Sequence, residues 1–228
     1  MDDGITIAGG LRIALRRSGR ARRMTLRVPR DGGDAVLTLP RHVALSEGRA
    51  FAESKRDWLL QATARRPVPQ RAAHGVAIPV EGVPRQMVPA PVPSARLEPD
   101  RLLIPEGRAV GSVVQAFLKH LAHRRLHDAC DRHATSLGRP FRAIALRDTR
   151  SRWGSCTADG RLMFSWRLAM APPAVLDYVA AHEVAHLAHM DHSPRFWAAV
   201  ERLMPDFRPR RDWLRRNGAD LLMWKFRD

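Results

Sequence analysis

The 228-residue sequence predicts an α+β fold, with short strands in the first part of the chain and helices in most of the rest. Two patterns carry this prediction. Within residues 11–40, apolar and basic side chains alternate as they do in half-buried strands. Residues 110–137 instead space their apolar side chains as a long helix with one buried face does. The hydrophobic content of 45% is enough for a core, and the length suits one ordinary domain or two small ones.

A short hairpin followed by a helix is predicted near the N-terminus. Residues 24–28 and 35–40 have the composition of strands and flank the turn-forming run Asp-Gly-Gly-Asp at 31–34. We therefore expect them to pair as antiparallel strands. Ser46 is a residue type preferred at helix N-caps, which predicts one helix over residues 47–64.

Proline separates this region from the helical remainder of the chain. Residues 67–99 contain many of the 17 prolines, and proline removes a backbone hydrogen-bond donor and disrupts helices. Short strands and connections are therefore expected there. The sequence thus predicts an N-terminal β-rich region with one helix over residues 1–105 and a second domain over residues 106–228.

The second domain is expected to begin with the long helix over residues 110–137. Two strands are predicted next, at residues 144–148 and 162–168, with a turn at the run Thr-Ala-Asp-Gly, residues 157–160. The long helix and these two strands are expected to form the first half of this domain.

Two consecutive helices are predicted after these strands. No proline or glycine interrupts residues 174–190, and the apolar positions there are spaced for a largely buried helix. The second helix is expected over residues 194–203. Ser193 is a preferred N-cap residue, and Pro194 is favoured at the first helical position.

The first of these two helices carries the run His-Glu-Val-Ala-His at residues 182–186. His182 and His186 are four residues apart and lie on one helical face, where two imidazoles can bind one zinc ion. Glu183 can reach a water at that ion, so the run matches the zinc-protease motif H-E-x-x-H. In a chain with 10 His the pattern can also arise by chance. A chance match, however, gives no reason for two His and a Glu in a mostly apolar helix.

A third ligand is expected where the chain turns between the two helices. A catalytic zinc needs three protein ligands and one open position, and His192 is the side chain that the turn can bring back to His182 and His186. The spacing approaches the longer metzincin pattern, which has glycine where this chain has His189. His189 is therefore a rival ligand, with a supporting or solvent-exposed role as its alternative.

Other side chains near the motif are candidates for supporting roles. Peptide hydrolysis also needs a group that stabilises the oxyanion formed at the attacked carbonyl. The candidates for this role are Tyr178, His189 and Arg152. Asp191 is a candidate for orienting a ligand His, or it is an exposed turn residue. Cys156 is either a reactive thiol beside the site or a small buried hydrophobic residue.

Several segments around the motif carry a family resemblance. They are Arg-Ser-Arg-Trp-Gly-Ser-Cys at 150–156, Trp-Arg-Leu at 166–168, Pro-Pro at 172–173, Leu-Asp-Tyr-Val at 176–179 and His-Ser-Pro-Arg-Phe-Trp at 192–197. With these segments the chain resembles the YgjP-like metallopeptidases, a group of small zincins related to the SprT proteins. The N-terminal half is similar more loosely, through its Arg-rich strands at 16–30 and Lys-Arg-Asp-Trp at 55–58.

The resemblance implies a zincin-like catalytic core, with helices packed on a small antiparallel sheet. It also implies zinc at the three His, Glu183 as general base, and peptide or protein substrates that lie along an edge strand. Residues 162–166 are the expected edge, which makes Trp166 a candidate cleft residue as well as a candidate for core packing. Two departures from the family pattern, Ser165 and the segment 82–85, concern substrate detail rather than the proposed ligands.

The basic charge of the chain supplies an alternative function. The net charge is +16 and the pI is about 11.5, a balance that indicates an anionic partner such as nucleic acid. The alternative is thus a basic, nucleic-acid-associated protein with a zincin fold that acts on or binds DNA-bound proteins. A solvated basic face and a structural zinc closed by a fourth ligand such as His189 are further alternatives.

The sequence also predicts where the protein acts. The N-terminal residues lack the basic and apolar regions of a signal peptide, and no apolar stretch approaches the length of a membrane helix. The two cysteines give no disulfide framework. We therefore expect a cytoplasmic protein that does not span a membrane.

Overall fold

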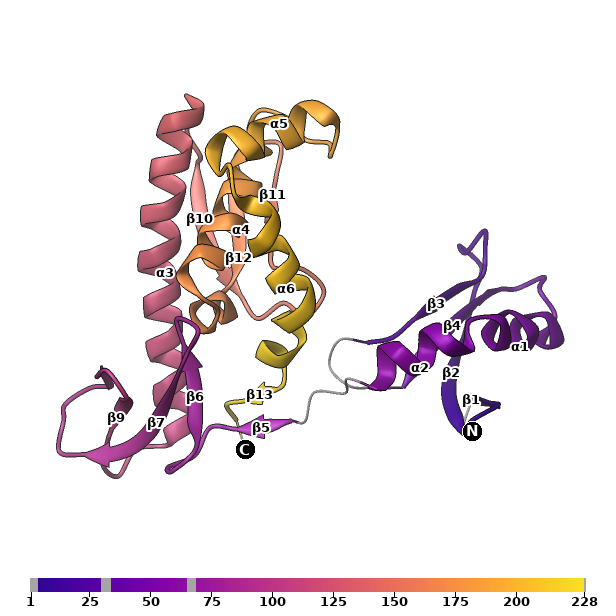
Figure 1. Ribbon diagram of the computed structural model, residues 1–228, viewed down its shortest axis with the longest axis horizontal. Helices are drawn as coiled ribbons and strands as arrows, with labels where there is room; N and C mark the ends of the chain where they lie inside the picture. Colours follow the sequence, from indigo (N-terminus) through magenta and orange to yellow (C-terminus); the bar gives the residue numbers. More distant parts are fainter. Residues whose placement is uncertain (1–3, 30–33, 65–68, 228) are drawn as a thin grey trace. The chain divides into compact units, whose positions relative to one another are not determined.

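The computed structural model describes residues 4–29, 34–64 and 69–227, and it confirms the α+β class (Figure 1). The chain divides into two compact units, Met1–Val68 and Pro69–Asp228. This division differs from the boundary predicted between residues 105 and 106. Buried side chains of the region before residue 105, such as Met87 and Leu102, share one core with the long helix that follows.

The N-terminal unit contains a four-stranded sheet in the order β1-β2-β4-β3. Its strands are β1 (Gly4–Ile7), β2 (Leu11–Ser18), β3 (Thr25–Arg27) and β4 (Ala35–Pro40). Strands β3 and β4 form the predicted antiparallel pair, whereas β2 lies between β1 and β4 and runs parallel to β4. The predicted turn at 31–34 lies largely outside the described residues.

Two helices, not one, pack on this sheet. Helix α1 (Leu45–Ser54) ends at Lys55, and α2 (Arg56–Ala64) begins directly after it. The N-cap of α1 is Ala44, so the prediction that Ser46 caps a helix starting at residue 47 is wrong. The break allows one side of each helix to face the sheet, and Ala52 and Leu59 are both buried in its core.

A second four-stranded sheet, β6-β7-β9-β8, opens the C-terminal unit and packs against α3 (Val110–Leu137). Its strands are β6 (Ala77–Val80), β7 (Val83–Ala90), β8 (Arg96–Leu97) and β9 (Arg101–Pro105). Helix α3 has the predicted bounds and ends at Gly138, which adopts the left-handed conformation with φ 70°. The short strands β5 (Gln70–Arg71) and β13 (Trp224–Lys225) pair and join the two ends of this unit.

A three-stranded sheet lies next to α3 and has the order β10-β12-β11. Its strands are β10 (Ala143–Arg147), β11 (Gly154–Cys156) and β12 (Arg161–Ser165). The sheet is mixed rather than purely antiparallel, because β10 runs parallel to β12. The predicted strand over 162–168 ends at Ser165, where the 3₁₀ helix η1 (Trp166–Met170) begins.

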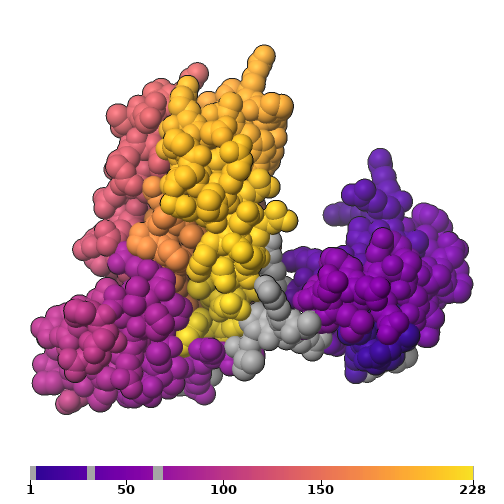
Figure 2. Space-filling model, viewed as in Figure 1, coloured from indigo at the N-terminus to yellow at the C-terminus, as the bar shows by residue number. Residues whose placement is uncertain are grey.

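Three more helices complete this unit, and the central one is α4 (Pro173–Ala185). In Figure 1, α4 lies between α3 and α6 (Phe207–Leu222), and it contacts both helices. Helix α5 (Pro194–Leu203) has its predicted bounds, and its N-cap Ser193 accepts a hydrogen bond from the Phe196 backbone N–H. In Figure 2 the yellow atoms around α6 cover much of the visible face of the unit.

The motif helix is shorter than predicted. Helix α4 ends at Ala185, and a hydrogen-bonded turn follows, in which the backbone N–H groups of Ala188 and His189 both donate to the Ala185 carbonyl. This turn reverses the chain toward α5. Nine of the 13 residues of α4 are buried, which explains why its sequence is mostly apolar.

Candidate metal centre

Three imidazoles meet where α4 ends and α5 begins. Metal-ligating atoms of His182, His186 and His192 all lie within 4.8 Å of one another, and they form the candidate metal-ligand cluster of the described residues. His182 comes from α4, and His186 is the C-cap residue directly after this helix. The turn that follows Ala185 returns the chain so that His192 faces both rings. Nε2 of His182 and Nε2 of His192 are 3.2 Å apart.

This spacing fits a shared metal ion. Two nitrogens bound to one tetrahedral zinc at about 2.0–2.1 Å stand about 3.3–3.4 Å apart, close to the separation of His182 and His192. Burial, followed by the nearby His186 and His192, lowers the pKa of His182 to about 3. The ring is therefore neutral at physiological pH, which is the form that binds metals.

The ring of His186 is fixed from two sides. Its Nδ1–H donates to the His189 carbonyl oxygen at 2.9 Å, which leaves the lone pair of Nε2 for a ligand. Phe196 stacks on the same ring at 4.4 Å between centroids. Because the Ser193 hydroxyl caps α5 at the Phe196 N–H, the start of α5 holds both His192 and the aromatic ring that supports His186.

Glu183 directly follows His182 in the chain and is buried. Its side chain is among the few charged groups of the interior, with 5% exposure. Burial raises the pKa of Glu183 to about 8, and the positive charge of Arg152 opposes this shift. A carboxyl group whose pKa lies near physiological pH can both accept and release a proton, as a general base requires.

Gly154 provides the space that Glu183 occupies. A Cβ atom at position 154 would lie 2.5 Å from Oε1 and 2.6 Å from Cγ of Glu183. In the sequence, Gly154 stands out only as part of the Arg-Trp-Gly-Ser-Cys run, and nothing there indicates this contact. The close approach of β11 to α4 explains why glycine is needed there.

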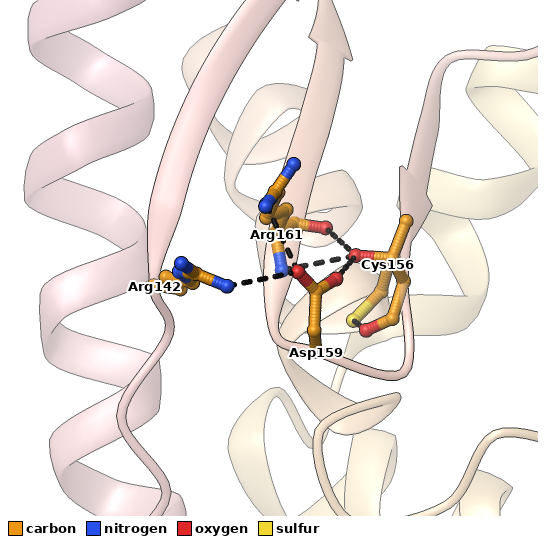
Figure 3. Close-up of polar contacts among 5 residues, drawn as sticks. Arg142, Cys156, Asp159 and Arg161 are labelled. Atoms are coloured by element: carbon orange, nitrogen blue, oxygen red, sulfur yellow. Dashed lines mark hydrogen bonds and ion pairs between the residues drawn. The ribbon is translucent and has the colours of Figure 1, made fainter.

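A polar network holds the turn that joins β11 to β12 (Figure 3). The carboxylate of Asp159 pairs with Arg142 at 3.2 Å and with Arg161 at 2.9 Å. The Thr157 hydroxyl donates to Asp159 at 2.6 Å and accepts from the Arg161 backbone N–H at 3.1 Å. These contacts fix the hairpin that places Gly154 against Glu183.

Cys156 lies on the same hairpin and is half-buried. Its thiol donates to the Thr157 carbonyl oxygen at 3.4 Å. Burial, with the negative charge of Glu183 adding to it, raises the pKa of Cys156 to about 11. The thiol is therefore protonated at neutral pH, which disfavours the reactive alternative.

The structure separates the supporting candidates from one another. The ring of Tyr178 is buried 6.0 Å from that of His182, and burial raises its pKa to about 12. The side chain of His189 is outside the candidate metal-ligand cluster. The carboxylate of Asp191 accepts from the Ser193 backbone N–H at 3.3 Å, which indicates a role in the turn. Arg152 is exposed, with its charge in range of Glu183.

Trp166 is a core residue. It is 1% exposed and packs edge-on against Phe226 at 5.1 Å between centroids. Strand β12, which precedes it, is paired on both sides. The expectation that residues 162–166 form a cleft edge is therefore wrong, and β11 is the edge strand beside α4.

A feature that sequence reasoning missed borders the cluster. The ring of Trp197 lies 5.7 Å from that of His182, and the guanidinium carbon of Arg211 lies 4.6 Å above Trp197. Arg211 belongs to α6, a helix that the sequence analysis did not anticipate. Charged side chains dominate the start of this helix, as in the run Arg-Arg-Asp-Trp at 210–213, and they obscure its apolar periodicity.

Comparison with known proteins assigns the chain to a family. The model of the family described as "YgjP-like, metallopeptidase domain" matches residues 22–217, so the chain belongs to this family of metallopeptidase domains. No curated protein matches the chain. Among solved structures, the chain is similar to the metallopeptidase zymogen of Pyrococcus abyssi abylysin, with 21% identity, a TM-score of 0.36, and coverage of 41% of this chain and 92% of that one.

Family membership assigns a metal-dependent peptidase at the level of class, which implies a metal ion and peptide or protein substrates. Within the described ranges, no helix is long and apolar enough to cross a membrane.

Proposed function

We propose that this protein is a zinc-dependent peptidase whose metal ligands are His182, His186 and His192. The observation that carries the proposal is the convergence of these three imidazoles beside the buried carboxyl group of Glu183. Among the described residues the cluster holds three ligand side chains, without a fourth. Three ligands suit a catalytic site that keeps one position open, whereas structural zinc sites are closed by four.

The donor set determines the chemistry that the ion would supply. Zinc bound to three imidazoles acidifies a water and polarises a carbonyl group. Glu183 would take a proton from the attacking water and deliver it to the leaving amine of the peptide. Its buried position supports this role, because a raised pKa lets the same carboxyl group gain and release the proton.

Strand β11 is the best-supported place for the substrate backbone. It pairs with β12 on one side, and Gly154 at its start lies against Glu183. An extended peptide could add to the other side by backbone hydrogen bonds. Such binding tolerates many side chains, so we expect broad rather than strict sequence specificity.

Arg152 is our candidate for stabilising the oxyanion. Its charge is in range of Glu183, and its side chain is exposed and free to approach a bound peptide. Tyr178 is less suited because its ring is buried between that of His182 and that of Phe207.

The substitution Glu183→Gln tests the proposal. It removes the proton-accepting group but keeps the size of the side chain and all three His. We expect cleavage of an unstructured protein such as casein to fall by about 10²- to 10⁴-fold, while bound zinc stays at the wild-type level. Retained cleavage, or loss of the metal together with activity, would contradict the role of Glu183.

A further inference from the structure

The N-terminal unit carries the densest positive charge of the chain. Residues 11–30 contain eight arginines and no acidic residue. Seven of these side chains are described and exposed. Arg12 pairs with Asp34, and Arg17 donates to the backbone carbonyl oxygens of Arg41 and Val43. The other five lie around β2, β3 and the connection between them, and we call them the arginine patch: Arg16, Arg20, Arg22, Arg23 and Arg27.

Strand register places two of these arginines on one face of the sheet. Arg16 lies opposite Thr38, and Arg27 lies opposite Val36, on the two sides of β4. Side chains alternate between faces along a strand. The buried residues of β4, among them Leu37, point to the helical side, so Val36 and Thr38 belong to the other face, where both are partly exposed.

This open face is therefore positively charged and not covered by α1 or α2. Its β4 positions are flanked by Arg16 on one side and Arg27 on the other, about 10 Å apart across the strand at the usual spacing between neighbours. In the part of the chain that the structure describes, no carboxylate pairs with any member of the arginine patch.

The patch has the chemistry of a phosphate-binding surface. Guanidinium groups bind phosphate oxygens with paired hydrogen bonds, and an uncovered sheet face can hold several of them along one backbone. The residues between Arg16 and Arg27 on this face are Thr25, Val36 and Thr38, none of which is aromatic. Without an aromatic stacking platform, contacts to bases contribute little.

We propose that the arginine patch binds the sugar-phosphate backbone of nucleic acid without reading its sequence. This function is separate from the proposed peptidase chemistry, because the patch and the His cluster lie in different compact units. Nucleic acid bound in this way would hold the protein near substrates that are themselves associated with nucleic acid.

Salt dependence follows from the number of phosphates bound. Five contacts to duplex DNA predict a slope of about −4.5 for log affinity against log salt. Raising the salt from about 50 to about 200 mM should then weaken binding by about 10²- to 10³-fold. Each arginine lost from the patch should reduce the steepness of the slope by about 1.

The test is binding of a labelled 20-base-pair DNA duplex of mixed sequence, followed by fluorescence anisotropy, to the full chain and its variants. The variant Arg16→Glu/Arg27→Glu should lose at least about 10-fold in affinity and give a flatter salt slope. The matched control Arg49→Glu/Arg56→Glu changes the net charge equally on the helical side and should lose much less.

Three outcomes would overturn the proposal: equal losses in the two variants, no wild-type binding below about 10 µM at low salt, or equal competition by polyglutamate. If circular dichroism shows that Arg16→Glu/Arg27→Glu unfolds the sheet, the variant Arg16→Gln/Arg27→Gln takes its place. A single-stranded RNA of equal length shows whether DNA or RNA supplies the backbone. Because Glu183→Gln should bind DNA normally, a failed peptidase proposal would leave this test intact.

Discussion

Two pairs of histidines in this protein have the same helical spacing but different surroundings. His182 and His186, at the C-terminal end of α4, have ring centroids 5.1 Å apart, and His123 and His127 on α3 have centroids 5.4 Å apart. Sequence spacing and ring separation alone therefore do not distinguish the two pairs.

Their neighbours do distinguish them. The α4 pair is largely covered, meets His192 and packs against Phe196. On α3, His123 is exposed, and Nδ1 of His127 lies 3.3 Å from the exposed carboxylate of Asp131. A third imidazole and the buried carboxyl group of Glu183 turn a common spacing into a candidate metal centre.

The largest difference between the two histidine pairs is expected when one candidate ligand is removed. We expect His182→Ala to lower zinc content to near background and activity by at least about 10³-fold, because two remaining imidazoles hold the ion poorly. The double variant His123→Ala/His127→Ala should keep the wild-type zinc content and activity. Metal analysis of the purified proteins beside a cleavage assay checks both. Equal zinc loss in the two variants would contradict the assignment, because the loss would not be specific to His182.

Filling the space beside Glu183 should have the next largest effect. In Gly154→Ala, a Cβ atom would lie 2.5 Å from the Glu183 carboxyl, so the carboxyl must move. A displacement of about 1 Å at the reacting groups can cost about 10²-fold in rate. We expect kcat/KM to fall by about that factor while zinc remains bound. Gly19→Ala is the control, because its Cβ would meet only the end of Arg41 at 3.5 Å. Unchanged kcat/KM in Gly154→Ala would contradict the assigned contact.

The smallest effect is expected on the free energy of unfolding, when two His–Asp pairs are compared. Asp177 bonds to the buried His133 at 3.0 Å, whereas Asp131 and His127 are solvent-exposed. Asp177→Asn should lower the free energy of unfolding by about 1–2 kcal/mol, and Asp131→Asn by no more than about 0.5 kcal/mol. Urea unfolding measures both. Equal effects would mean that burial does not strengthen the first pair.

The contribution of Asp177 should also depend on pH. Burial raises the pKa of Asp177, but the hydrogen bond and charge of His133, with Arg132, outweigh burial and hold the pKa below its usual value. A carboxyl whose pKa is lowered by folding stabilises the native state above about pH 4, and this stability is lost as the pH falls further. The difference between wild type and Asp177→Asn should therefore shrink in acid.

Local signals in the sequence predicted much of the candidate site. The cap Ser193-Pro194 and the periodicity of residues 110–137 gave the bounds of α5 and α3 as observed. The expected placement of His192 depended on the same cap, because a helix starting there requires the chain to turn just before it.

Features set by tertiary packing were missed. The break at Lys55 exists because α1 and α2 both face one sheet, which no local pattern records. The role of Gly154 depends on the approach of β11 to α4. The position of β12 depends on pairing with β10, and the charge of α6 hides the buried face that includes Phe207 and Leu221.

X-ray absorption at the zinc edge of the purified wild-type protein, with the metal quantified, tests the central claim most directly. We expect one zinc per chain, bound by the three imidazoles of His182, His186 and His192 and by one oxygen from solvent. A fourth side-chain ligand, or zinc content that His182→Ala leaves unchanged, would contradict it.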